Sequence, residues 1–484
     1  MKKINNKTIH ILILLLGSIF ICLSIFHTSL WFDETYSVGM ANHSLVDIWK
    51  IGGNDVHPVL YYWLLRIVSL ITGGSILAYR IFSAIPIILL GVIGYTHIRK
   101  DFGEKTGMLF SFLALFIPVS TVYANQIRMY SWAALILTLF FIYSYRLYKG
   151  EHSFKNWLIF FGLSLCSIYI HYYGLMAAGI TNVLLLLFFI KNKDIKSIRN
   201  IVISGIVQLV LYIPWLIYFV GQLEHVSDGF WIKLQLEDKL KILASQYLIG
   251  ESLYPAVVLA VILLVYIIIS LIRKRKEIDI KPVIFAIIIY LLVIIGAIVV
   301  EKVLKTPILY HRYLFVVIGL YIFAFSYMLS KENNKYIVAI VCLAVLCFGI
   351  ANCVYQVKHN YNKENLEAVN FFKENLKEDD EIIYRHIGAG SIIAVNFNNK
   401  QYFYNPEDWK VEKAYKAYGP QMQTYITDEF KEDFGNRVWV IDTYDDAVYD
   451  EFFNNDEYKV ITETEFSTDY NECYKYKIRL VERN

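Results

Sequence analysis

Long apolar runs separated by short polar connections dominate the first 354 residues of the chain. With 57% hydrophobic and only 18% charged residues in a chain of 484, these runs exceed what one soluble core can bury. The pattern predicts a polytopic α-helical membrane protein with about eleven transmembrane helices. The predicted spans lie at about residues 9–27, 76–96, 107–123, 129–148, 156–171, 174–190, 198–220, 253–272, 281–300, 309–329 and 335–354.

A further apolar run at residues 57–73 suits either a short span or a helix that lies in the membrane interface. If this run does not cross, the basic clusters after the later spans fall on the same side as the lysines that precede the first span. The positive-inside rule then assigns all of them to the cytoplasm. We therefore expect residues 28–75 to form one long outer loop with interfacial helices at about 44–51 and 57–73.

The composition changes abruptly near residue 355 and becomes rich in Asp, Glu, Lys, Asn and Tyr. Parity of the spans places this tail outside the cytoplasm, so we predict two domains, residues 1–354 in the membrane and residues 355–484 outside it. Helical apolar spacing in the tail alternates with short β-branched or aromatic runs, which is typical of a small α/β domain. The predicted helix is 363–376, and the predicted strands are Glu381–Tyr384, Arg437–Ile441 and Tyr474–Ile478.

Two adjacent carboxylates, Asp33 and Glu34, follow the first span directly. Like charges side by side at the end of a membrane helix repel each other, so the pair indicates a functional role. We interpret Asp33 as a general base for an acceptor hydroxyl and Glu34 as a neighbour that orients it or helps to hold a metal. The structural alternative is that Asp33 caps a helix at residues 34–41.

The stretch Asp55-Val56-His57-Pro58 returns polar groups to the membrane surface. Asp55 and His57 have side chains of the metal-ligand type, and with a carboxylate from the first loop they would bind a divalent cation. Two such residues do not define a metal site. In the alternative interpretation, Asp55 caps a helix that begins near Pro58.

Arginines stand at the outer ends of two predicted spans. Arg128 and Arg312 can each bind a phosphate in a fork geometry that lysine cannot match, and two of them in one outer cavity would suit an anionic headgroup. Arginine is also a common interfacial anchor, which is the alternative. Arg80 lies near the outer start of the second span and is a third candidate to contact the same phosphate; the alternative is a structural salt bridge.

Aromatic and polar side chains occur at the same predicted level and are candidates to line a substrate cavity. An aromatic belt at the membrane interface would explain the tyrosines equally well. The candidates are His57, Tyr61, Tyr123, His171, Tyr172, Tyr173 and His311.

These motifs carry a resemblance to a known family. The order WFDETYS, HPVLYYWLLRI, AYRIFSAIP, ANQIRMYSW and HRYLF resembles bacterial family 39 glycosyltransferases. That family belongs to the glycosyltransferase C superfamily, together with protein O-mannosyltransferases and lipid A aminoarabinose transferases. The resemblance covers residues 1 to about 354, and the tail is only loosely like the outer domains of such enzymes.

The resemblance implies a polyprenyl-phosphate sugar donor, with Asp33 as the base, Glu34 as its partner, and Arg128 and Arg312 near the donor phosphate. In some relatives an acidic residue before the proline of the second motif binds metal. Here that position is His57, a departure that leaves the metal and its ligands open. The expected reaction is inverting transfer to an acceptor hydroxyl on a cell-envelope glycan, lipid or protein at the outer face of a bacterial plasma membrane.

Two other classes of protein share some of these features. A transporter or flippase of lipid-linked sugars would also need many spans and outer arginines, but it usually places ionisable residues near the midplane. A membrane scaffold with a binding tail would tolerate loss of both acidic residues. Nucleic acid is not an expected partner, because the net charge is only +3 and the basic residues cluster between apolar runs.

Overall fold

The chain divides into two compact units in the computed structural model, which describes residues 5–227, 235–404, 415–418, 422–426, 434–443, 445–468, 470 and 474–484. The first unit comprises Met1–Ile25, Val56–Tyr61 and Arg80–Val357. The second comprises Phe26–Asp55, Tyr62–Tyr79 and Lys358–Asn484. Most of the long outer loop predicted after the first span therefore groups with the C-terminal tail.

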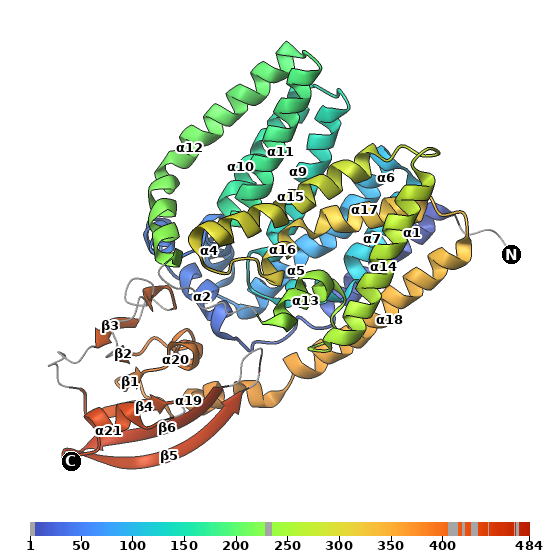
Figure 1. The fold of residues 1–484 in the computed structure, drawn as a ribbon. Coiled ribbons are helices and arrows are strands. Elements are labelled where there is room, and N and C mark those ends of the chain that lie inside the picture. Colours follow the sequence, from blue (N-terminus) through green and yellow to red (C-terminus); the bar gives the residue numbers. More distant parts are fainter. Residues whose placement is uncertain are drawn as a thin grey trace. The chain divides into compact units, whose positions relative to one another are not determined.

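Helices make up almost all of the first unit (Figure 1). Among the described residues, eight are long and apolar enough to cross a membrane, or nine if a bent pair counts as one span. The first unit contains α1 (Asn6–Cys22), most of α5 (Ile76–Ile93), α6 (Arg99–Phe102), α7 (Glu104–Phe116), α8 (Pro118–Asn125), α9 (Tyr130–Tyr148), α10 (Phe154–Ile170), α11 (Tyr172–Lys191), α12 (Ile195–Ser227), α13 (Leu236–Ala244), α14 (Leu253–Lys274), α15 (Lys281–Leu304), α16 (His311–Leu314), α17 (Ile318–Ser330) and most of α18 (Lys335–Asn360).

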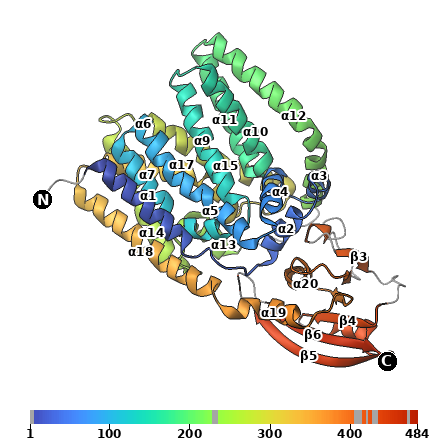
Figure 2. The ribbon, with the colours of Figure 1, turned by 180° about the vertical axis from the view of Figure 1, so that it is seen from behind.

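The helices of the first unit differ in how much of their surface is covered. In the segment Tyr130–Tyr148, which forms α9, 78% of the most apolar 18-residue stretch is buried. In His311–Ser330 the buried fraction of the corresponding stretch is 89%. In Ile195–Glu224 and Lys281–Leu304 it is only 22% and 28%. Exposed apolar side chains on a helix of that length need lipid around them. These two poorly covered helices therefore support the assignment of the chain as a membrane protein. Figure 2 shows α9, α10, α11 and α12 following one another side by side.

The pair α7 and α8 is bent by 58° at Ile117. Ile117 has an extended backbone and Pro118 occupies the first turn of α8, where its missing N–H costs nothing. After the bend, α8 ends at Asn125, three residues before Arg128.

The second unit begins with three short helices: α2 (Phe32–Ala41), α3 (Leu45–Gly53) and most of α4 (Leu60–Thr72). The interfacial helices predicted at 44–51 and 57–73 correspond to α3 and α4. Both are amphipathic, with Val46 and Ile71 among their exposed apolar residues. The indole rings of Trp49 and Trp63 stack with their centroids 5.6 Å apart and join the two helices.

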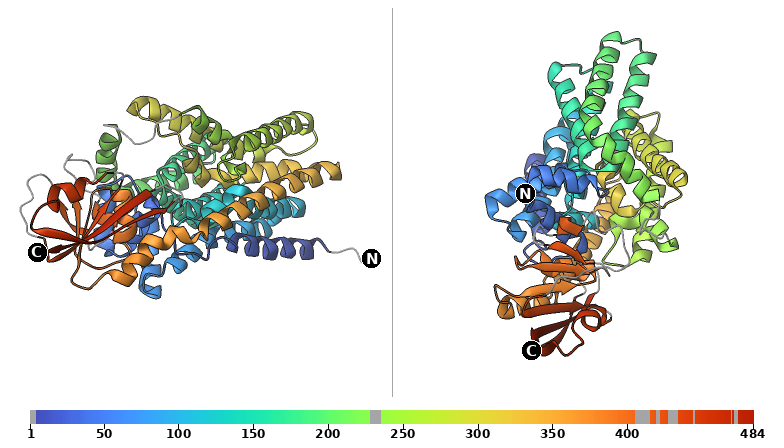
Figure 3. Two further views of the ribbon diagram at one scale, coloured as in Figure 1. Left: turned by 90° about the horizontal axis from the view of Figure 1, so that it is seen from below. Right: turned by 90° about the vertical axis from the view of Figure 1, so that its left-hand side faces the viewer.

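The C-terminal part of the second unit is built on a six-stranded mixed sheet of order β3-β2-β1-β4-β6-β5. The first four strands in that order are parallel, whereas β6 and β5 form an antiparallel pair along one edge (Figure 3). Its elements are α19 (Glu367–Asn375), β1 (Glu381–Tyr384), α20 (Ile387–Ala394), β2 (Gln401–Tyr404), β3 (Met422–Ile426), β4 (Arg437–Asp442), α21 (Ala447–Phe452), β5 (Tyr458–Thr468) and β6 (Tyr474–Arg483).

Alternation along the buried strand β4 divides the core between the two faces of the sheet. Trp439 and Ile441 pack in the cluster that includes residues of α19 and α20. Val438 and Val440 pack in the opposite cluster with Val448 of α21. The predicted strands correspond to β1, β4 and β6, and the predicted helix 363–376 corresponds to a 3-10 turn (Lys363–Leu366) followed by α19.

The functional division at residues 354 and 355 stays a prediction. The structure places the break between its compact units at Val357 and Lys358, within α18.

We expect Asp380→Asn to destabilise the C-terminal sheet. Asp380 is buried and accepts hydrogen bonds from Arg437 Nε at 2.8 Å and Trp439 Nε1 at 2.7 Å. Burial raises the pKa of this carboxyl, but the hydrogen bonds outweigh it and leave the pKa below the usual 3.8. Removing the charge should cost about 1–3 kcal/mol at pH 7, where the carboxylate is ionised.

The measurement is hydrogen exchange of β4 in the full-length protein. Because the folded pKa is the lower one, the stabilisation is present above pH 3.8 and is lost as the pH falls through the folded value. The neighbouring Asp379 is exposed, so Asp379→Asn serves as the control. Equal exchange rates in both variants at pH 7 would contradict the expectation.

Candidate functional site

The acidic pair lies in the first turn of α2. The helix begins at Phe32 with Trp31 at the N-cap position, so Asp33 does not cap a helix that starts at residue 34, and that alternative is wrong. Carboxylates in a first turn are stabilised by the helix dipole. Glu34 is fully buried, whereas Asp33 is half-buried. Asp33 is therefore the more exposed member of the pair.

Asp55 belongs to the same unit and interacts with Tyr36 of α2. Burial, and after it the charge of Asp55, holds the pKa of the Tyr36 hydroxyl well above its usual value. Tyr36 therefore stays protonated in the electrostatic field of the Asp55 carboxylate. This interaction links the end of α3 to the helix that carries the acidic pair.

Arg128 and His57 meet in the first unit. Arg128 is only 3% exposed, and its Nη2 donates to His57 Nε2 at 3.0 Å. Because a guanidinium has donors only, His57 must accept through Nε2 and carry its proton on Nδ1. The result is a buried permanent positive charge beside a neutral imidazole.

His171 forms the next part of this cluster, in the single residue between α10 and α11. His171 is buried, with only 7% of its surface exposed. The Tyr173 backbone N–H donates to its Nδ1 at 3.1 Å, so the proton of the neutral ring is on Nε2. His171 is consequently a neutral donor at physiological pH and adds no charge to that of Arg128.

Arg80 supports the loop that carries Arg128. It is fully buried, and its Nη1 donates to the backbone carbonyl of Asn125 at 2.6 Å. Asn125 is the last residue of α8. The contact gives Arg80 a role in fixing the end of the bent helix pair, and its predicted contact with a donor phosphate stays a prediction.

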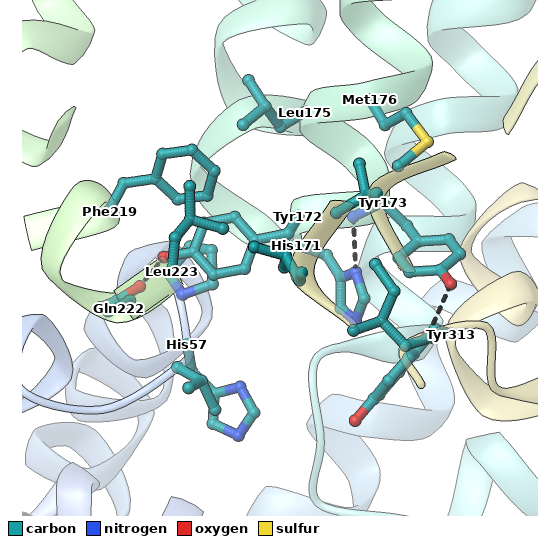
Figure 4. Close-up of a pocket in the computed structure, with 15 residues that line it drawn as sticks. His57, His171, Tyr172, Tyr173, Leu175, Met176, Phe219, Gln222, Leu223 and Tyr313 are labelled. Carbon is teal, nitrogen blue, oxygen red and sulfur yellow. Dashed lines mark hydrogen bonds between the residues drawn. The ribbon is translucent and has the colours of Figure 1, made fainter. Parts of the chain in front are cut away.

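A cavity of about 300 Å³ opens beside His57 and His171 (Figure 4). Leu175 and Met176 lie at one side of it, with His57 and Tyr313 at the other. Its walls come mainly from α11, α12 and α15, and they are almost entirely apolar. The lining residues are Val56, His57, Pro58, His171, Tyr172, Tyr173, Leu175, Met176, Phe219, Gln222, Leu223, Val300, Leu304, Ile308 and Tyr313.

Hydrogen bonds fix the aromatic walls of the cavity. The Tyr172 hydroxyl donates to Gln222 of α12 and accepts from Trp215 Nε1 at 3.2 Å. The Tyr173 hydroxyl donates to the backbone carbonyl of Ile308 at 2.8 Å. These bonds tie the start of α11 to two other walls, so the cavity is preformed.

Arg312 lies in α16, where its guanidinium stacks 5.1 Å from the centre of the Tyr310 ring. The Tyr310 ring also contacts those of His311 and Tyr313, with centroids 4.4 Å and 5.9 Å apart. Tyr313 in turn lies 5.6 Å from the ring of His171. A continuous aromatic path therefore connects the segment that carries Arg312 with the cavity wall.

The structure brings part of the predicted site together. His57, His171, Tyr172 and Tyr173 line the cavity, and Arg128 contacts one of them. The remaining cavity candidates lie elsewhere in the first unit: Tyr61 near Ser83, Tyr123 against Tyr130 and Phe315, and His311 against Tyr310. Asp33, Glu34 and Asp55 belong to the second unit.

Sequence analysis missed the apolar lining and Tyr313. Residues such as Leu175, Phe219 and Val300 look like any other residue of an apolar span. Their convergence depends on how three helices pack, and no local pattern encodes it. Tyr313 is the tyrosine of the HRYLF motif, and its position directly after Arg312 was the signal that could have identified it.

The predicted metal site draws on residues of both units. Among the described residues, no three His, Cys, Asp or Glu side chains come together as a metal site requires. His57 Nε2 accepts from Arg128 in the first unit, whereas Asp55 belongs to the second. The Asp55 and His57 metal site therefore stays a prediction, and we derive no step through a metal ion.

Comparison with known families supports the resemblance seen in the motifs. Residues 56–218 match the family described as Dolichyl-phosphate-mannose-protein mannosyltransferase. These residues include His57, Arg128 and His171. The match supports the expected relationship to this group of glycosyltransferases over this part of the chain. No curated protein matches the sequence.

Solved structures share the fold over almost the whole chain. ArnT from Cupriavidus metallidurans matches with a TM-score of 0.62 when bound to undecaprenyl phosphate and 0.63 in the apo state, at 10% identity. The matches cover 97% and 98% of this chain and 97% of each ArnT chain. The Archaeoglobus fulgidus oligosaccharyltransferase in complex with Zn and sulfate matches with a TM-score of 0.50 at 13% identity, covering 96% of this chain and 72% of that one.

Proposed function

We propose, from the premise that residues 56–218 belong to the mannosyltransferase family, that this protein is a membrane glycosyltransferase that uses a polyprenyl-phosphate sugar. The observation that carries the proposal is the buried Arg128 beside a preformed apolar cavity. The guanidinium of Arg128 suits an anion, and the apolar cavity suits a hydrocarbon chain. A lipid phosphate has both parts in one molecule.

The donor would bind with its phosphate at the cationic end of the cavity. Arg128 offers guanidinium donors, and the neutral His171 and His57 add N–H donors without further charge. We assign Arg312 to the same phosphate, and the isoprenoid to the walls formed by α11, α12 and α15. The bound undecaprenyl phosphate in ArnT, which shares this fold, supports that assignment.

We propose that Asp33 is the general base. It takes the proton of an acceptor hydroxyl, whose oxygen attacks the anomeric carbon from the face opposite the phosphate. The bond between that carbon and the phosphate oxygen breaks, and the lipid phosphate leaves with its charge stabilised by Arg128 and Arg312. Configuration is inverted. Glu34, buried next to the base, orients it.

We further propose that α1 and α10, each 17 residues long and apolar, also cross the membrane, which returns the total to eleven spans. The N-terminus then lies in the cytoplasm of a bacterium, and the C-terminal unit lies outside. At the outer face no nucleotide sugar is present, so an activated sugar must arrive on a lipid. The acceptor is a glycan, lipid or protein of the cell envelope.

Asp33→Asn is expected to abolish transfer while leaving expression and the melting temperature unchanged. The amide has nearly the same shape as the carboxylate but cannot accept a proton, so turnover should fall by roughly 10²- to 10⁴-fold. The assay uses purified protein, a panel of labelled polyprenyl-phosphate sugars, and release of lipid phosphate as the readout. Asp47→Asn, at an exposed aspartate of α3, is the matched control.

If the Asp33→Asn variant turned over substrate at the wild-type rate, Asp33 would not be the general base. Movement of labelled lipid across vesicles without release of lipid phosphate would instead identify a flippase.

Arg128→Lys should raise the KM for the donor by roughly 10- to 100-fold, because a lysine keeps the charge but loses the fork of donors. The control is Arg99→Lys, at a partly exposed arginine paired with Glu104. The measurement is donor-dependent kinetics at saturating acceptor. Equal KM values in Arg128→Lys and the wild type would separate Arg128 from donor binding.

A further inference from the structure

The helix that carries the acidic pair is packed against residues more than 350 positions later in the chain. One stripe of α2, formed by Phe32, Thr35, Tyr36 and Gly39, has the spacing of a single helix face. All four contact α20 or the 3-10 turn η6 (Tyr415–Tyr418) of the same unit. Asp33 lies outside this stripe and is half-buried.

Aromatic rings make the first contact of the stripe. Tyr418 stacks on Phe32 with centroids 5.1 Å apart and ring planes only 9° from parallel. The same Tyr418 ring meets Tyr36 edge to face at 5.5 Å. One side chain of η6 therefore contacts α2 on both sides of Asp33 and Glu34 in sequence.

Close backbone approach makes the second contact. A Cβ atom at Gly39 would lie 2.0 Å from the backbone oxygen of Ala417 and 2.5 Å from the carbonyl carbon of Tyr418. Backbone atoms cannot move aside as a flexible side chain can, so only glycine permits this spacing. Just beyond α2, His43 Nε2 lies 2.8 Å from the backbone oxygen of Lys416.

The third contact connects α2 to the sheet. The Thr35 and Ser391 hydroxyls lie 2.8 Å apart, and Thr35 Oγ1 also donates to the Phe32 carbonyl at 2.7 Å. Ser391 belongs to α20, which packs tightly on β1 because Gly390 leaves room for the Tyr384 ring. A Cβ at Gly390 would lie 2.2 Å from that ring. Through α20, the position of α2 is therefore fixed relative to the buried strand β1.

From these contacts we propose that the C-terminal part of the second unit positions the catalytic carboxylates of α2, with Tyr418 and Gly39 as the positioning residues. The inference rests on the proposed function, since it concerns the placement of its base. A general base must lie within hydrogen-bond reach of the proton it removes, and a displacement of about 1 Å can cost 10²-fold in rate. A helix held at three points by η6 and α20 meets that requirement better than a loop end at a membrane surface.

The test compares Gly39→Ala and Tyr418→Ala with the wild type in the full-length protein. We expect kcat to fall about 10- to 100-fold in each, while the KM for the polyprenyl-phosphate sugar stays unchanged, because the donor cavity belongs to the other unit. Hydrogen exchange of α2 should rise in both variants. Tyr418→Phe keeps the stacked ring and should restore kcat, which a general loss of folding would not allow.

Gly162→Ala is the matched control, because a Cβ at that helical glycine meets nothing within 4 Å. It should keep the wild-type kcat. The inference is overturned if Asp33→Asn is inactive but Gly39→Ala and Tyr418→Ala turn over like the wild type. If Asp33→Asn itself is active, the proposed function fails first. If neither alanine variant folds, Tyr418→Phe and Tyr418→Leu are compared instead, and equal kcat values in these two would overturn the inference.

Discussion

A buried guanidinium beside a neutral imidazole is the interaction on which the first unit depends. An arginine cannot shed its proton in a protein, so Arg128 keeps a full charge at 3% exposure. His57 accepts from it, and His171 is neutral because its Nδ1 accepts from the Tyr173 backbone N–H. The site therefore carries one fixed positive charge with several donors around it, an environment that favours an anionic ligand over a cation.

The surroundings of that charge explain why the ligand is taken to be a lipid phosphate. The cavity next to it is lined largely by Leu175, Met176, Phe219 and other apolar side chains, which suit a hydrocarbon chain. Tyr172 and Tyr173 are fixed by hydrogen bonds to two other walls. Preformed walls reduce the ordering cost of binding a long flexible chain. Charge and cavity together select an amphipathic donor.

The sequence predicted the features that interrupt a local pattern. Asp33, Arg128 and the basic clusters stand out because ionisable groups are rare beside apolar spans, and β1, β4 and β6 stand out because their residues are β-branched or aromatic. It could not predict the partners of α2. The stripe of Phe32, Thr35, Tyr36 and Gly39 has the right spacing, but η6 and α20 lie more than 350 residues away. The bend at Ile117 was also hidden, because Pro118 reads as one apolar residue in a continuous span.

The compact units do not follow the change in composition at residue 355. Phe26–Asp55 groups with Lys358–Asn484, so the acidic helix is structurally part of the C-terminal unit. Under our proposal, the C-terminal part of the second unit helps to place the base. Its removal would then affect the chemical step as well as recognition, unlike removal of an appended binding module.

The most direct measurement of the central claim is photo-crosslinking of the purified protein with a polyprenyl phosphate that carries a diazirine on its first isoprene unit. The account predicts that label appears in peptides containing residues 171–176 and 219–223, and that unlabelled undecaprenyl phosphate competes it away. Label spread over the lipid-facing surfaces of α14 and α18, with no competition, would contradict it.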